Sequence, residues 1–215
     1  MHNIGALSYS TASLPWSFVA AGAVGDGNNT DAVLPAGVLQ NDLLIIHAAI
    51  ASGGGDFSTP AGWSVGLLNG GVVKHSVWYK IAGASEGNAT VPNSGGSTRN
   101  RAYMLAYRNI KGTPLDVLGT EASGTSASPA TASLTTSVAN GLVVSFYVAQ
   151  VDATGRTFSA PASTTTRKNV ALTETKPGLL SVDENKVAAG ATSVRTATLS
   201  SSDNWDAFSI AFKQV

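Results

Sequence analysis

The acidic side chains are the first residues that could do chemistry, because a glycoside hydrolase needs two carboxylates on either side of the bond that it cleaves. Most of them stand beside Gly, Ser or Asn, which are typical turn residues. No spacing selects two of them as a catalytic pair, and we interpret them as turn and surface acids. They are Asp56, Glu86, Asp116, Glu121, Asp152, Glu174, Asp183, Glu184, Asp203 and Asp206.

Other catalytic patterns are missing from the sequence. It has no Walker A loop, no G-x-G-x-x-G turn and no H-E-x-x-H metal motif. It has no cysteine, which excludes a thiolate zinc site, a Cys nucleophile and disulfides. We therefore predict a protein that is not an enzyme and that carries no metal or other cofactor.

Two weaker candidates for chemistry remain. The stretch "DGNNTD" (26–31) offers hard oxygen ligands from Asp26, Asn28, Thr30 and Asp31, but it lacks the spacing and the closing Glu of a calcium loop. His47 and His75 lie within strand-like stretches, where a hydrogen-bonded core or interface histidine is the simpler interpretation.

Aromatic side chains could bind a sugar by stacking or serve as hot spots for a protein partner. Trp78 lies in "VVKHSVWYKIA" (72–82), on the same face as Lys74 and Lys80, and it is our candidate for an exposed aromatic residue. Packing under a loop is the alternative for the tryptophans.

The elements that would position these residues are strands. The stretch 72–82 alternates with a period of two, and "DLLIIHAAI" (42–50) and "GLVVSFYVA" (141–149) are short apolar runs bounded by polar or Gly residues. Gly-, Ser- and Asn-rich turns separate the strands. Only "DENKVAAGA" (183–191) is a helix candidate. We predict an all-β, antiparallel, jelly-roll-like β-sandwich.

The chain repeats itself in a fixed order, which indicates an internal duplication. We predict one sandwich domain over 33–215, with halves at 33–110 and 132–215 joined by 111–131. The matching pairs are "NDLLI" (41–45) with "NGLVV" (140–144), "FSTPA" (57–61) with "FSAPA" (158–162), "KIAGASEGNATV" (80–91) with "KVAAGATSVRTATL" (186–199), and "YMLAYRNI" (103–110) with "FSIAFKQV" (208–215).

The last repeat predicts which side chains form the core. Alternation places the larger apolar residues of both copies inward and the basic residues at the strand ends outward. We expect loss of the final eight residues to destroy the fold. The predicted core residues are Tyr103, Leu105, Tyr107, Phe208, Ile210 and Phe212.

The first 25 residues contain no Asp, Glu, Lys or Arg, and the duplication starts later. We interpret residues 1–32 as an arm or extra strand, laid on the domain or on a neighbouring subunit, and the residues that would dock it on a partner are Tyr9, Pro15, Trp16 and Phe18. The segment is a poor signal peptide, and no apolar stretch is long enough for a transmembrane helix.

The composition narrows the class of protein. Charged residues make up 12% of the chain and the formal net charge is zero, while 43% of the residues are hydrophobic. A chain of this kind can bury a core, so it is not disordered, and it lacks the basic excess of a nucleic-acid-binding protein. We predict neither nucleic-acid binding nor membrane insertion.

The order "NDLLIIHAAI … TPAGWSV … VWYKIAGASEG … RAYMLAYRNI … PLDV", continued by the second half, resembles a β-sandwich family found in virion proteins of tailed bacteriophages. Its members include minor tail, tail-fibre-like and head-decoration proteins. The resemblance implies a structural protein on the released particle, made in the host cytoplasm and bound to other capsid or tail proteins. It also implies a homo-oligomer, often a trimer, and leaves open the position on head or tail and a role in host attachment.

Two other functions stay open at this point. A carbohydrate-binding module would fit a jelly roll with an exposed Trp, and a host-surface glycan would then be its ligand. A glycan hydrolase is the weaker alternative, since no pair of acids is singled out.

Overall fold

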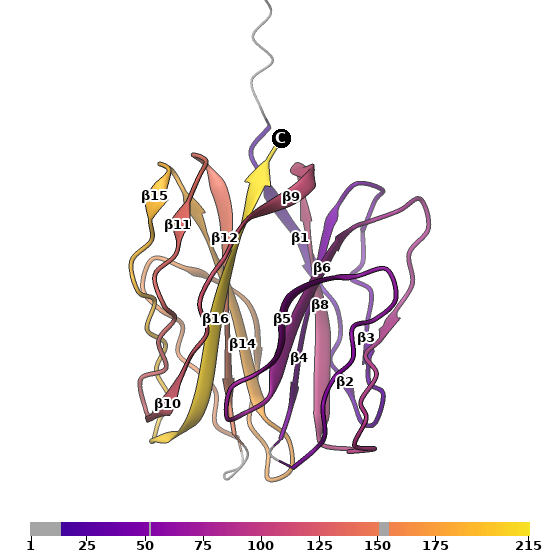
Figure 1. The fold of residues 1–215 in the computed structure, drawn as a ribbon, viewed down its shortest axis with the longest axis vertical. Coiled ribbons are helices and arrows are strands. Elements are labelled where there is room, and N and C mark those ends of the chain that lie inside the picture. Colours follow the sequence, from indigo (N-terminus) through magenta and orange to yellow (C-terminus); the bar gives the residue numbers. More distant parts are fainter. Residues whose placement is uncertain (1–13, 52, 151–154) are drawn as a thin grey trace, which may run out of the picture.

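The computed structural model describes residues 14–51, 53–150 and 155–215 of the chain. Within these ranges every regular element is a β-strand, and the strands form two facing sheets (Figure 1). The prediction of an all-β antiparallel sandwich built from two sequence-similar halves is confirmed. No helix in the described ranges is long and apolar enough to span a membrane.

The first half of the chain forms one complete six-stranded sheet, in which neighbouring strands are antiparallel. Its order is β1 (Ser17–Ala21), β8 (Asn100–Arg108), β4 (Leu43–Ile50), β6 (His75–Ile81) and β5 (Ser64–Gly70), with β2 (Gly25–Asp26) also beside β8.

The second half repeats this arrangement in a sheet of its own. Its order is β10 (Ala122–Ser126), β16 (Asp203–Gln214), β12 (Gly141–Ala149), β14 (Gly178–Lys186) and β13 (Thr165–Val170), with β9 (Ile110–Leu118) also beside β16. The strand order β8-β4-β6-β5 thus corresponds to β16-β12-β14-β13. Each copy of the duplicated sequence therefore forms its own sheet.

Two small ribbons lie outside the sandwich, one beyond each sheet (Figure 1). They pair β3 (Asp31–Ala32) with β7 (Ala89–Thr90) and β11 (Thr135–Thr136) with β15 (Gly190–Ala191). Separate apolar clusters fill the outer faces of the two sheets. The central strands are therefore buried on both faces, which explains why 42–50 and 141–149 are nearly continuous apolar runs.

The main core fills the space between the two sheets, and both halves contribute to it. All six side chains that the last repeat placed inward belong to this cluster, so that prediction is confirmed. Tyr79 of β6 packs edge-on against Phe212 of β16, with ring centroids 5.4 Å apart. The last strand is thus central to the contact between the halves.

The two sheets include strands that lie outside the predicted halves 33–110 and 132–215. β1 to β3 lie before residue 33 and belong to the first half, while β9 and β10 lie within the predicted joining segment 111–131. An edge strand pairs through its backbone, so these segments need no sequence likeness to be equivalent.

The helix suggested for 183–191 is wrong. Residues 183–186 end β14, and residues 190–191 form β15. Gly190 has a φ of 128°, which no helical residue adopts.

Candidate functional site: an apolar sheet edge

The described residues of the predicted arm are fixed on the domain itself. Trp16 and Phe18 pack edge-on against Tyr107, with ring centroids 6.0 and 5.3 Å away. Trp16 Nε1 donates a hydrogen bond of 3.2 Å to Asn185 Oδ1 of β14, and Pro15 O accepts one of 2.8 Å from Asn109 Nδ2. Tyr9 lies outside the described residues. The docking of an arm on a partner stays a prediction.

The prediction of an exposed Trp78 is wrong. Trp78 is 0% exposed and packs against Phe57, and its Nε1 donates a hydrogen bond of 3.3 Å to Thr59 Oγ1. The loop between β4 and β5 covers this outer face of the sheet, although the Lys74 and Lys80 side chains on the same face are partly exposed.

Trp63 is the partly exposed tryptophan of this region instead. It lines a shallow hollow with Pro60, Glu86 and Asn88, and the Lys80 ammonium lies 5.2 Å from the centre of its ring. Lys80 also forms a 2.6 Å ion pair with Glu86. The ring therefore offers only part of its area to a ligand.

The structure also places the calcium-like stretch 26–31 and a serine motif that was not considered from the sequence. Asp26, from the calcium-like stretch, forms ion pairs with Arg101 and Lys176 at 3.1 Å each. The described ranges contain no group of three His, Cys, Asp or Glu that could hold a metal ion. Ser85 in "GASEG" (83–87) has the spacing of a nucleophile elbow, but it lies in an exposed loop between strands, whereas that elbow joins a strand to a helix.

Several acids that we interpreted as surface residues are buried, which corrects that interpretation. Asp183 binds Arg167 at 2.6 Å and Asp203 binds Arg156 at 2.7 Å. Asp206 accepts hydrogen bonds from the backbone amides of the β5–β6 hairpin. Each buried carboxylate thus has a partner, and we assign these acids a structural role.

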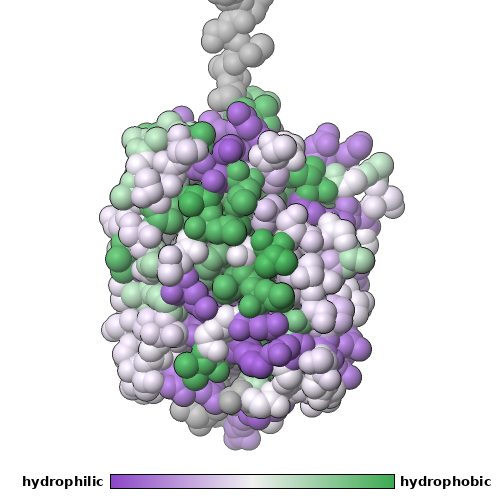
Figure 2. All heavy atoms as spheres, viewed as in Figure 1, coloured by the Kyte–Doolittle hydropathy of each residue, from purple (hydrophilic) through white to green (hydrophobic). Residues whose placement is uncertain are grey.

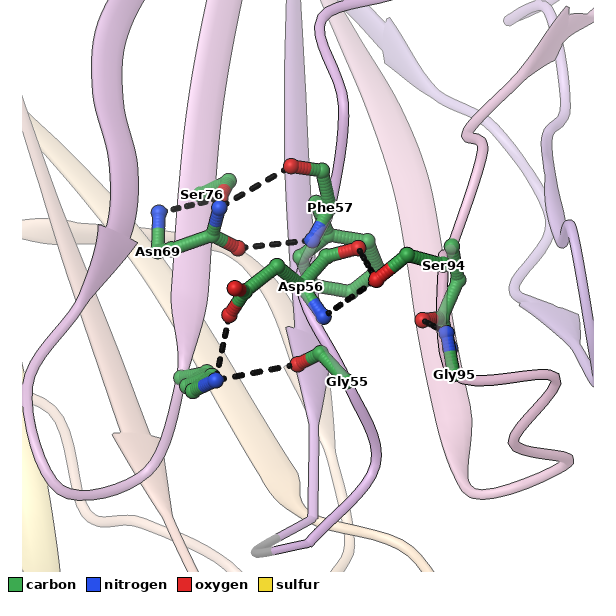
Figure 3. A network of polar contacts seen from close by, with 9 residues as sticks. Gly55, Asp56, Phe57, Asn69, Ser76, Ser94 and Gly95 are labelled. Carbon is green, nitrogen blue, oxygen red and sulfur yellow. Dashed lines mark hydrogen bonds and ion pairs between the residues drawn. The ribbon is translucent and has the colours of Figure 1, made fainter.

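At the end of the sandwich opposite the C-terminus (Figure 1), loops of the first half are held together by a polar network (Figure 3). Asn69 of β5 accepts a 2.7 Å hydrogen bond from Phe57 N and donates one of 2.9 Å to Phe57 O. Lys74 forms an ion pair with Asp56, whose backbone amide donates a 3.1 Å hydrogen bond to Ser94 Oγ. These contacts position the β5–β6 hairpin.

The strand β5 is the outermost strand of its sheet and has no strand on its outer side. It lies within residues 57–73, which contain no charged side chain. Large apolar side chains on β5 and near it are exposed, and Figure 2 shows hydrophobic residues gathered on the face where β5, β9 and β16 meet. We call this the β5 edge surface and define it by Val65, Leu68, Val72 and Leu118.

The equivalent edge of the second sheet is different. Both β5 and β13 have an irregularity at the same place, so that Val65 corresponds to Thr166 and Leu67 to Lys168. Arg167 stacks over Phe18 with its guanidinium carbon 4.5 Å from the ring centre, and Lys168 donates a 2.9 Å hydrogen bond to Gly22 O. Basic side chains therefore occupy the β13 edge, while the β5 edge is apolar.

This surface was not predicted from the sequence. The signal was present, since residues 57–73 form a long charge-free run that includes an edge strand. The sequence does not show which strand lies at the edge of the sheet, so an exposed apolar surface could not be predicted from this run.

Comparisons with protein-family models, with curated proteins and with solved structures found no match for this chain.

Proposed function

We propose that this chain is a structural component of a bacteriophage particle that acts by protein–protein assembly through the β5 edge surface. The observation that carries the proposal is an uncharged edge strand flanked by exposed apolar side chains. The resemblance of the repeated strands to virion β-sandwich proteins supports the particle as the setting. The position on head or tail, and a part in host attachment, stay open within this proposal.

The backbone of β5 is not paired with another strand on its outer side. A free edge presents N–H and C=O groups that another strand can pair with, and proteins usually protect such edges with Lys or Pro. β5 contains neither residue, whereas β13 carries Arg167 and Lys168. Exposed apolar side chains beside a free edge favour addition of a strand from another chain.

We propose a second copy of this chain as the partner. A homo-oligomer, a trimer included, would bury the β5 edge of each copy. Residues 1–13 contain no Asp, Glu, Lys or Arg. We propose that they provide a further contact to the particle.

The solution mass of the full chain tests the interface. We expect sedimentation to show an oligomer for the wild type and a smaller species for Leu68→Lys. Val194→Lys is the control, because Val194 is also exposed but lies in the second half, outside the β5 edge surface. Val65→Lys serves as a second variant. A monomeric wild type, or an oligomer unaffected by both β5 variants, would contradict the proposed interface.

The protein composition of purified phage particles tests whether this chain is part of the virion. Mass spectrometry of density-purified particles, from a lysate that contains this chain, should find its peptides at a stable ratio to the capsid or tail proteins. Peptides found only in the particle-free fraction would contradict a role in the virion.

A carbohydrate-binding module is the second candidate, favoured by the hollow at Trp63. Aromatic rings with nearby polar groups are common in ligand sites, and Glu86 and Asn88 lie beside this ring. A glycan array should then show binding that Trp63→Ala abolishes, with Trp78→Ala expected to unfold the domain instead. No glycan bound by the wild type would remove this candidate.

A further inference from the structure

Two histidines lie side by side in the interior, between the two sheets. His47 of β4 and His75 of β6 are both 0% exposed. Their ring centroids are 5.7 Å apart, with an angle of 73° between the rings. Histidine is the residue type whose ordinary pKa lies near neutral pH.

The surroundings of His47 are suited to a neutral ring. Its Nδ1 lies 3.0 Å from Tyr103 Oη of β8, and Tyr103 Oη lies 2.5 Å from Ser181 Oγ of β14. Phe146 of β12 packs edge-on, with its centroid 5.0 Å away. His47 Nε2 is buried and has no hydrogen-bond partner. No carboxylate contacts this ring.

His75 has the acidic neighbours. Its Nε2 lies 3.3 Å from Glu121 Oε1, at the start of the segment that leads into β10. The carboxylate of Asp206, on β16, also interacts with it electrostatically. On β8, Arg101 is bound to Asp26 and to backbone carbonyls. Negative charge therefore compensates only one of the two histidines.

The second half shows that this fold does not require the histidines. The paired registers place Phe146 where the first half has His47, Leu179 where it has His75, and Phe208 where it has Tyr103. An apolar set fits the same positions. His47, His75 and Tyr103 are thus found only in the first half. Packing alone does not explain why these polar residues stand there.

We propose that the buried His47–His75 pair is an acid-sensitive element: the packed contact between the two sheets excludes a charge on His47, so acid loosens this contact. A charge on His47 would lie in the protein interior, in a ring whose centroid is 5.7 Å from that of His75, and a buried charge without a partner is costly. His47 has a hydroxyl and a phenyl ring beside it, and neither can neutralise a charge. This proposal does not depend on the proposed assembly function.

The direction of the pH effect follows from the folded state. Burial lowers the pKa of His47 well below its ordinary value, and the neighbouring His75 lowers it further. The unfolded chain takes up a proton near pH 6.5 while the folded chain does not, so stability is lost as the pH falls below about 6.5.

Urea unfolding between about pH 7.5 and about pH 5 tests the proposal. We compare the wild type with His47→Phe and with the double variant His47→Phe/His75→Leu, which copy the second half. Below about pH 6.5 the wild-type unfolding constant should rise up to tenfold more per pH unit than that of His47→Phe, since one excess proton gives this slope. His47→Gln replaces His47→Phe if the latter does not fold.

Tyr103→Phe is the matched control. It removes the hydroxyl next to His47 but keeps both histidines, so it should destabilise the protein by a similar factor at every pH. Equal slopes for the wild type and for the His47 variants would overturn the proposal. So would imidazole NMR signals that show a charged His47 in the folded protein at about pH 5.5.

Discussion

Arg101 and Asp206 occupy equivalent positions in the two halves, and each binds the backbone of a hairpin in the opposite half. Arg101 Nη1 donates hydrogen bonds to the carbonyls of Ala171 and Pro177, the latter at 3.1 Å. Asp206 accepts hydrogen bonds of 3.0 and 2.6 Å from the amides of Val72 and Val73. The two contacts lie at equivalent positions of the two halves, but a cation makes one and an anion makes the other.

This relationship shows how a duplicated chain became asymmetric. An arginine supplies donors to carbonyl groups, whereas an aspartate supplies acceptors to amide groups, so each side chain suits only one hairpin. The two sheets therefore cannot exchange places, although their strands have the same order.

Removing the arginine should weaken the contact between the halves. We expect Arg101→Met to lower the free energy of unfolding by about 1–3 kcal/mol, because two backbone carbonyls lose a buried charged donor. Urea unfolding measures the effect. Lys111→Met is the control, since it removes one positive charge from an exposed position; an equal loss in both variants would contradict a specific role for Arg101.

The close approach of Asp206 to its hairpin requires a glycine. A Cβ on Gly71 would lie 1.7 Å from Asp206 Oδ1, and Gly71 has a φ of 73°. Gly62 has a similar φ of 80° but no atom near its missing Cβ. Both Gly→Ala changes should cost about 1–2 kcal/mol of backbone strain.

Only Gly71→Ala should also displace the carboxylate, which adds about 1–3 kcal/mol for the hydrogen bonds that are lost. Thermal unfolding of the two variants side by side measures this difference. Equal losses would show that the position of Asp206 does not depend on Gly71.

The pKa of Asp206 gives a second pH effect, opposite in sign to that of His47. Burial raises this pKa to about 6, and nearby Glu121 contributes in the same direction. The folded state therefore binds the proton more tightly than the unfolded state, whose pKa is near the ordinary 3.8. The Asp206 contribution to stability rises as the pH falls from about 6 to about 4.

The variant Asp206→Asn removes this effect, while titrating groups that do not interact with Asp206 contribute alike to both proteins. Relative to the variant, the wild type should gain up to about 3 kcal/mol between neutral pH and about pH 4. The measurement is the difference in unfolding free energy against pH. A difference that stays constant would contradict the raised pKa.

The end of the chain should be indispensable for the fold. Phe212→Ala removes a fully buried ring that packs against Tyr79, and we expect a loss of about 3–5 kcal/mol. Val215→Ala is the control, because Val215 is 58% exposed. A chain that ends at residue 207 should not fold, and a cooperative unfolding transition in that variant would contradict the account.

Much of the fold was predictable because the duplication repeats its apolar pattern in both halves. Alternation in 103–110 and 208–215 identified the inward side chains, since strand periodicity is local. The assignment of one sheet to each half was not predictable, because it depends on pairing between segments far apart in the chain.

The wrong predictions have the same cause, because each depends on contacts between segments far apart in the chain. Trp78 shares its face with two lysines, but the loop that covers it is a tertiary contact. Asp206 stands next to Trp205 and resembles a surface acid, while its amide partner Val73 lies 133 residues earlier. The apolar character of residues 57–73 was visible, but its meaning required knowledge that β5 lies at a sheet edge.

Amide hydrogen exchange at low and at high protein concentration tests the proposed interface most directly. We predict that amides of residues 64–68 exchange more slowly when the concentration rises, because a second chain covers the β5 edge. The equivalent residues 165–170 of β13 should not change. Exchange that is independent of concentration at β5, or slowed at β13 instead, would contradict assembly through the β5 edge surface.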